Sequence, residues 1–205
     1  MAFIASSMPA AAALKRLRIL GVDPAAAGAT GYGVVEFDRR GARMLRFGAL
    51  RLPSQATFAV RLRQIHHLIA GLLEEFSPDA VAVESVFTAL NARTALKLAE
   101  VRGVVLLAAA QASIPAHSYS PREVKASVAG FGAASKQQMQ QMVRATLGLR
   151  QLPEPADAAD ALAVALCHAY LSRAGARLAA AMAPAPVALH ASRNPSRVAR
   201  VHLGR

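Results

Sequence analysis

Two short apolar runs in this chain end in a carboxylate, and this feature constrains the fold more than any other. The first run is Leu-Arg-Ile-Leu-Gly-Val-Asp, ending at Asp23, and the second is Ala-Val-Ala-Val-Glu, ending at Glu84. Such runs predict buried strands, and a carboxylate at the end of a buried strand costs free energy unless a partner neutralises it. A divalent cation is a suitable partner, because oxygen ligands suit Mg²⁺ or Mn²⁺.

A second pair of carboxylates, Asp157 and Asp160, lies in an alanine-rich helical stretch. Residues three apart share one face of a helix. If the two acid-ended strands are parallel neighbours, their carboxylates emerge at the sheet edge where sites collect in open α/β folds. Four converging carboxylates repel one another without cations. Together they could hold two Mg²⁺ roughly 4 Å apart, the arrangement that serves phosphoryl transfer.

Each acid also has a plainer interpretation. Asp23 could cap a strand end, Glu84 could be a buried ion-pair partner, and Asp157 could stabilise the start of its helix. The joint occurrence of the four acids favours a site, but spacing alone leaves both interpretations open.

The excess of basic residues indicates which class of partner the protein binds. The chain carries 24 Lys and Arg against 12 Asp and Glu, a formal net charge of +12 with a pI near 11.3. This balance favours a polyanion, either nucleic acid or an anionic membrane surface. No apolar run reaches the roughly 18 residues of a membrane span. Cys167 is the single cysteine, which excludes an intramolecular disulfide and indicates a reducing compartment such as the cytoplasm.

The order of the predicted elements indicates an α/β fold. Strands are expected over 17–23, 31–37, 43–52, 79–84 and 115–119, and helices over 57–76, 92–112, from 121 to a break at 130, 135–147 and 156–174. On the third strand, alternation places Leu45, Phe47, Ala49 and Arg51 on one face. Three hairpin-connected strands followed by βαβ units predict a mixed five-stranded sheet flanked by helices.

The predicted folded domain spans residues 17–176. We expect residues 1–16 to form a poorly ordered extension. Residues 177–205 are rich in alanine and proline and then basic, which is typical of a disordered tail.

Several separate motifs between about residues 17 and 174 together resemble those of one known protein family. They are Gly21-Val22-Asp23-Pro24, Thr30-Gly31-Tyr32-Gly33-Val34-Val35-Glu36, Val83-Glu84-Ser85-Val86-Phe87, Asn91-Ala92, Ala95-Leu96-Lys97-Leu98, Arg102-Gly103-Val104, Tyr119-Ser120-Pro121-Arg122-Glu123-Val124-Lys125, Gly130-Phe131-Gly132 with Lys136, and Asp157-Ala158-Ala159-Asp160-Ala161-Leu162-Ala163. In order and spacing, the set resembles the RuvC-type Holliday-junction endodeoxyribonucleases.

The resemblance implies a ribonuclease H-like fold, a homodimer, and Mg²⁺-dependent symmetric nicking of four-way DNA junctions in recombination and repair. It implies two Mg²⁺ (or Mn²⁺) per site, held by the catalytic acids Asp23, Glu84, Asp157 and Asp160. As DNA-binding residues it suggests Phe87, Lys97, Arg102, Lys125 and Lys136. It also suggests a branch-migration motor complex as a partner.

The DNA-binding candidates have alternatives. A phenylalanine following a strand is more often a core residue, and lysines usually lie on solvated helix surfaces. Lys97 and Arg102 could serve the helix surface or dimer contacts. The helix over 92–112 is the candidate for dimer packing, because its apolar surface exceeds what one sheet needs.

One departure from the family pattern keeps rival functions open. The family commonly has glycine two residues after the first Asp, whereas Ala25 stands here in a loop that is one residue longer. Alanine resists backbone angles that glycine permits. A junction-binding protein without catalysis would bind DNA with strong salt dependence and cleave nothing. A nucleotide-binding relative of the same fold would instead bind or hydrolyse ATP.

Overall fold

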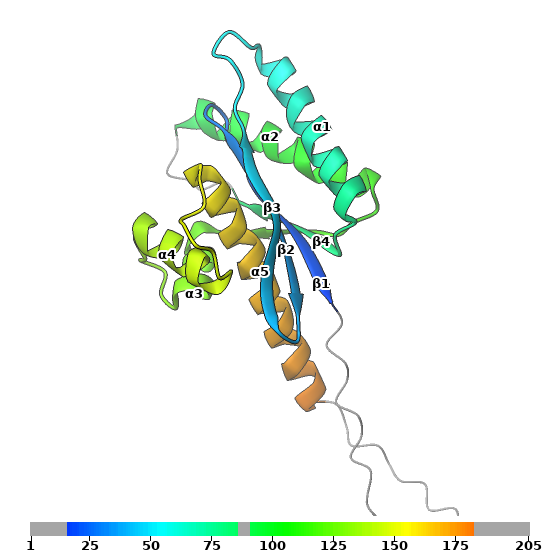
Figure 1. Ribbon diagram of the computed structural model, residues 1–205. Coiled ribbons are helices and arrows are strands. Elements are labelled where there is room, and N and C mark those ends of the chain that lie inside the picture. The colour runs from blue at the N-terminus through cyan, green and yellow to red at the C-terminus, as the bar shows by residue number, and fades with distance from the viewer. Residues whose placement is uncertain (1–15, 86–90, 183–205) are drawn as a thin grey trace, which may run out of the picture.

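Five strands form one mixed sheet in the computed structural model, which describes residues 16–85 and 91–182 (Figure 1). The strands are β1 (Leu17–Asp23), β2 (Thr30–Asp38), β3 (Gly41–Leu50), β4 (Ala80–Glu84) and β5 (Ala116–Tyr119), in the spatial order β3-β2-β1-β4-β5. The first three strands are antiparallel, while β4 lies parallel to β1 and β5 parallel to β4. The predicted mixed five-stranded sheet is confirmed.

The helices are α1 (Phe58–Phe76), α2 (Ala92–Gln111), α3 (Pro121–Ala129), α4 (Lys136–Thr146) and α5 (Ala156–Met182). Their bounds agree closely with the prediction except at one end. Helix α5 continues to Met182, beyond residue 174 where we expected it to end, and so extends into the segment predicted to be disordered. The alanine-rich sequence of this region has high helix propensity, which accounts for the longer helix.

Each face of the sheet buries its own apolar cluster. Helices α1 and α2 pack on one face, around Leu20, Ile69 and Val105. Helices α3, α4 and α5 cover the other face, around Ile19, Val35 and Leu166 (Figure 1). Strands β1 and β4 lie in the middle of the sheet and are buried on both faces, as their continuous apolar sequences predicted.

The prediction that Leu45 and Phe47 share a face of β3 is wrong. Leu45 packs with the cluster under α1 and α2, whereas Phe47 packs with the cluster under α5. The cause is a register shift: Val34 pairs with Arg46 and Val35 with Met44, which leaves Leu45 as an extra residue. A bulge of this kind reverses the alternation that follows it.

Two glycines allow α5 to lie against the sheet at backbone contact. A Cβ at Gly31 would overlap the backbone carbonyl of Asp157, and a Cβ at Gly21 would overlap the backbone of Ala161. Small residues on α5 complete the fit, since Ala158 and Ala161 are fully buried. This close approach brings the first turns of α5 beside the end of β1.

Candidate active site

Two of the predicted acids lie side by side at the end of the sheet. Val22 of β1 pairs with Val83 of β4 in parallel register, so Asp23 and Glu84 are the next residues on neighbouring strands. The Asp23 side chain hydrogen-bonds to Glu84. The condition that the two acid-ended strands are parallel neighbours is therefore met.

Burial and like charge change the acidity of this pair. Burial is the largest cause that raises the pKa of Asp23 to about 9, followed by the carboxylates of Glu84 and Asp160. Burial also raises the pKa of Glu84, while the hydrogen bond from Asp23 opposes that rise. In the absence of a cation, Asp23 therefore keeps its proton at neutral pH and donates it to the carboxylate of Glu84.

The two acids of α5 face this pair but have basic partners of their own. The carboxylate of Asp160 lies 3.1 Å from Nζ of Lys136, and that of Asp157 lies 4.0 Å from the guanidinium of Arg51. Both aspartates also contribute to the raised pKa of Asp23. The structure thus brings the four predicted acids into one electrostatic cluster, with Lys136 and Arg51 as its counter-charges.

A cavity of about 230 Å³ opens beside the acids. Glu84 and Asp160 line it together with Lys125 and Lys136, and its apolar wall is formed by Pro121, Val124, Met139 and Ala163. Carboxylates and ammonium groups therefore meet in a partly enclosed space, a setting in which charges interact strongly.

Capping boxes at the starts of α3 and α4 place the two lysines. Ser120 caps α3 together with Glu123, and Ser135 caps α4 together with Gln138. Lys136 is the first residue of α4, and Asp160 raises its pKa through their hydrogen bond. The charges of Lys125 and Lys136 in turn oppose the rise in the pKa of Glu84.

The carboxylate oxygens of the four acids are suitable ligands for a divalent cation, although the two aspartates of α5 contact basic side chains instead. In the part of the chain that the structure describes, no three His, Cys, Asp or Glu side chains are placed to hold a metal ion. Hard oxygen donors nevertheless suit Mg²⁺. The raised pKa values of Asp23 and Glu84 also indicate that a cation bound between these carboxylates would relieve their repulsion.

The remaining predicted DNA-binding residues lie in different places, away from the acids or outside the described residues. Nζ of Lys97 lies 5.5 Å from the ring centroid of Phe58. Arg102 donates a hydrogen bond to Oγ of Ser118, so it joins α2 to β5. Phe87 lies outside the residues that the structure describes.

Arg51 lies beside the acids, although its sequence pattern did not predict a role at the site. We expected it to continue the apolar face of β3, but its side chain is 74% exposed and approaches Asp157. Its signal in the sequence is weak, because one arginine after a strand is commonplace on a basic surface.

Comparison with known proteins decides the family. The family model for crossover junction endodeoxyribonuclease RuvC matches residues 19–168. The chain belongs to the RuvC family. It is 49% identical to the RuvC of Chloroflexus aurantiacus over 75% of this chain and 93% of the relative, and 46% identical to that of Syntrophomonas wolfei over 77% and 91%.

Solved RuvC structures show the same fold. The Thermus thermophilus RuvC structure superposes with a TM-score of 0.72 at 37% identity, covering 78% of this chain and 97% of the other. The T. thermophilus RuvC in complex with Holliday junction substrate gives 0.71 at 35% identity, with the same coverage. The expected family and ribonuclease H-like fold are therefore confirmed. No helix within the described ranges is long and apolar enough to cross a bilayer.

Proposed function

We propose that this RuvC family endonuclease resolves Holliday junctions by paired, symmetric phosphodiester hydrolysis at the carboxylate edge of its sheet. The activity follows from family membership. The observation that supports the location is the convergence of Asp23, Glu84 and the α5 acids, where burial raises the pKa of both Asp23 and Glu84.

In this proposal two divalent cations, Mg²⁺ or Mn²⁺, bind to Asp23, Glu84, Asp157 and Asp160. When bound, they would neutralise charge on the scissile phosphate and activate a water molecule for in-line attack. Asp23 must release its proton as the site loads, because a carboxylate binds a cation in its ionised form. Lys136 and Arg51 must give up their contacts with Asp160 and Asp157.

The lysines beside the cavity would then serve the DNA. Once released from Asp160, the ammonium of Lys136 is free to contact a phosphate oxygen, and Lys125 lines the same cavity. Lys97, Arg102 and Phe87 are further DNA-binding candidates. Of these, Arg102 is the weakest, because its guanidinium already binds Ser118.

Symmetric cleavage of a four-way junction calls for two active sites, so we propose a homodimer. Helix α2 is the proposed interface, because Leu96 and Leu107 are 66% and 52% exposed on it. Sedimentation should show a dimer at micromolar concentration. A monomer both alone and on junction DNA would contradict this arrangement.

We also propose that the protein works in the cytoplasm, where a branch-migration motor complex would deliver the junction. The chain has a single cysteine and so forms no intramolecular disulfide, which suits a reducing compartment.

Calorimetric titration with Mn²⁺ tests the proposed metal site. We expect two ions per chain and release of protons on binding. Asp23→Asn should lose most of this binding, while the control Asp38→Asn, at the far end of β2, should keep it. Equal binding by the two variants would contradict the assignment.

A further inference from the structure

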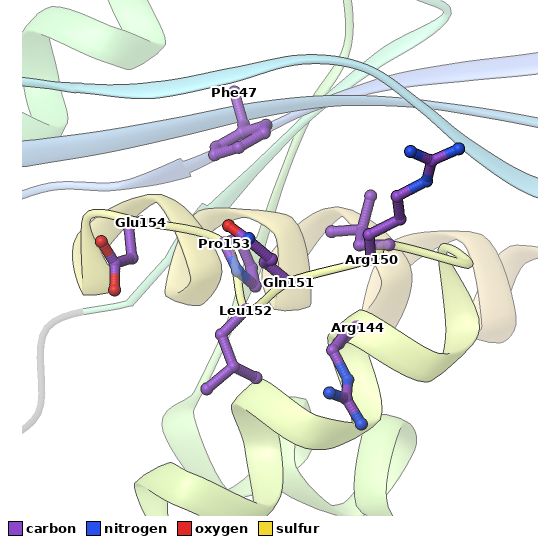
Figure 2. A pocket seen from close by; sticks show the side chains of 8 residues that line it. Phe47, Arg144, Arg150, Gln151, Leu152, Pro153 and Glu154 are labelled. Atoms are coloured by element: carbon purple, nitrogen blue, oxygen red, sulfur yellow. The ribbon is translucent and has the colours of Figure 1, made fainter.

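A separate cleft of about 880 Å³ lies between β3 and the loop that joins α4 to α5 (Figure 2). It is lined by Phe47, Arg144, Leu149, Arg150, Gln151, Leu152, Pro153 and Glu154. None of these residues belongs to the carboxylate cluster or was singled out as a DNA-binding residue. The same loop leads directly into the first turn of α5, which carries Asp157. The cleft and the proposed active site are therefore joined by one short segment.

The charge in this cleft is unbalanced. Within residues 16–85 and 91–182, neither Arg144 nor Arg150 forms an ion pair, whereas Arg43, Arg46 and Arg51 each pair with an acid. Glu154 is the one acid of the lining, and it lies at the opposite end of the cleft from Arg150 (Figure 2). Arg144 and Arg150 thus have no counter-ion in the described part of the chain, and their side chains point to different sides of the loop, Arg150 toward the strands and Arg144 away from them (Figure 2).

The frame that carries these arginines is well packed. The N–H of Leu149 donates to the carbonyl of Arg144 at 2.9 Å, which closes the end of α4 and fixes the start of the loop. Leu149 packs against the core, and Pro153 is buried. Phe47 packs against the same core from β3 and forms the facing wall. A held backbone lowers the entropy lost when a ligand binds.

We propose that this cleft binds the backbone of a junction arm outside the scissile position, with Arg144 and Arg150 each contacting a different phosphate. Guanidinium groups suit this role because their planar donors bind phosphate oxygens in pairs. Duplex DNA presents phosphates continuously along its length, so an arm that crosses the carboxylate edge offers further phosphates to the adjoining cleft. The inference rests on the proposed junction-cleaving function and adds a second contact to it.

Occupation of the cleft can be observed directly, because the chain contains no tryptophan. Phe47→Trp would place a single indole on the cleft wall, with a melting curve to confirm folding. We expect its emission to change when a four-way junction binds. Adding Arg144→Gln and Arg150→Gln should abolish that change at DNA concentrations where anisotropy still reports saturation. An emission change that survives both substitutions, or no change in any variant, would overturn the proposal.

Affinity gives a second, independent test in the otherwise unaltered full chain. Arg144→Gln with Arg150→Gln should weaken junction binding about tenfold and reduce the slope of log affinity against log salt by about 1–2, as expected for the loss of one or two phosphate contacts. The matched control is Arg39→Gln with Arg40→Gln, which removes the same charge from the exposed turn between β2 and β3, away from the acids. Equal losses in both double variants would show a general charge effect and overturn the assignment.

DNA binding at the cleft and DNA cleavage at the acids can be tested separately. Both tests above measure binding, so they are carried out in Ca²⁺ or EDTA without cleavage. Single-turnover cleavage by the parent protein in Mg²⁺, at saturating protein, tests the proposed function separately, and the control variant of Arg39 and Arg40 should cleave like the parent. Normal cleavage with unaltered binding would reject the cleft alone, whereas absence of cleavage in the parent protein would reject the proposed function alone.

Discussion

Asp23 is the residue whose environment departs most from that of an ordinary surface acid. Its pKa rises from 3.8 to about 9 in the folded protein, first because of burial and then because of Glu84 and Asp160. A raised pKa means that the protonated form contributes stability. That contribution is complete below about pH 4, the range of an unfolded aspartate, and is lost as the pH rises toward 9.

Asp23→Asn should therefore change how stability depends on pH in metal-free protein. The variant carries a neutral side chain at every pH, so the stability of the wild type relative to the variant should fall between about pH 4 and 9. Urea unfolding at several pH values in EDTA measures this difference. A difference that stays constant, or that matches the behaviour of Asp38→Asn, would contradict the buried and crowded environment assigned to Asp23.

Glu36 shows the opposite case, an acid that the fold stabilises in its charged form. It is 3% exposed, and its carboxylate binds Arg18 at 2.9 Å and Arg43 at 2.8 Å. The hydrogen bond from Arg18 is the main reason that its pKa is lowered. Its contribution to stability is thus present above the ordinary glutamate range and is lost as the pH falls through the lowered value.

Glu36→Gln should destabilise the protein by about 1–3 kcal/mol, because charged hydrogen bonds are lost and the half-buried guanidinium of Arg18 keeps only the carbonyl of Phe76 and loses its acidic partner. Thermal or urea unfolding at pH 7 measures the loss. The loss should shrink at low pH, and junction cleavage by the folded fraction should be unchanged, because Glu36 lies outside the carboxylate cluster. A large loss of cleavage by fully folded variant would contradict this separation.

At the scale of elements, the contact of α5 with the sheet determines where two of the four acids lie. Gly31→Ala would place a Cβ against the backbone of Asp157, so α5 must shift. We expect a destabilisation of about 1–3 kcal/mol, the usual cost of overpacking, and weaker metal binding.

Gly28→Ala is the matched control, because a Cβ there meets nothing within 4 Å. Unfolding and Mn²⁺ titration should distinguish the two variants. Equal behaviour would mean that the close approach of α5 does not position the acids.

Much of this architecture was predictable from sequence, because apolar strands ending in acids and two serine caps are local signals. The sequence offered the parallel pairing of β1 with β4 only as a supposition, and the structure supplies it. Three features were not predictable. The bulge at Leu45 depends on how β3 pairs with β2. The ion pair of Lys136 with Asp160 depends on how α4 packs on α5. The end of α5 at Met182 reflects helix propensity in a segment whose composition is also typical of a disordered tail.

At the scale of the whole molecule, the chain combines a net charge of +12 with a small acidic site. The basic surface favours DNA at long range, while the carboxylates repel phosphate until cations neutralise them. Binding should therefore persist without divalent metal and weaken with salt, whereas cleavage should require the metal. This separation distinguishes the account from a junction-binding protein without catalysis.

Incubation of the full chain with a labelled mobile four-way junction and Mg²⁺ is the measurement that tests metal-dependent junction cleavage at Asp23. Asp23→Asn, Asp38→Asn and a linear duplex are the controls. We expect paired nicks that ligase can seal, in the junction and not in the linear duplex. Asp38→Asn should retain this cleavage. Asp23→Asn should reduce it at least about a thousandfold, because removal of a catalytic metal ligand costs several kcal/mol of transition-state stabilisation. Binding without cleavage in Mg²⁺ and Mn²⁺ across several junction sequences, or equal cleavage by Asp23→Asn, would contradict this expectation.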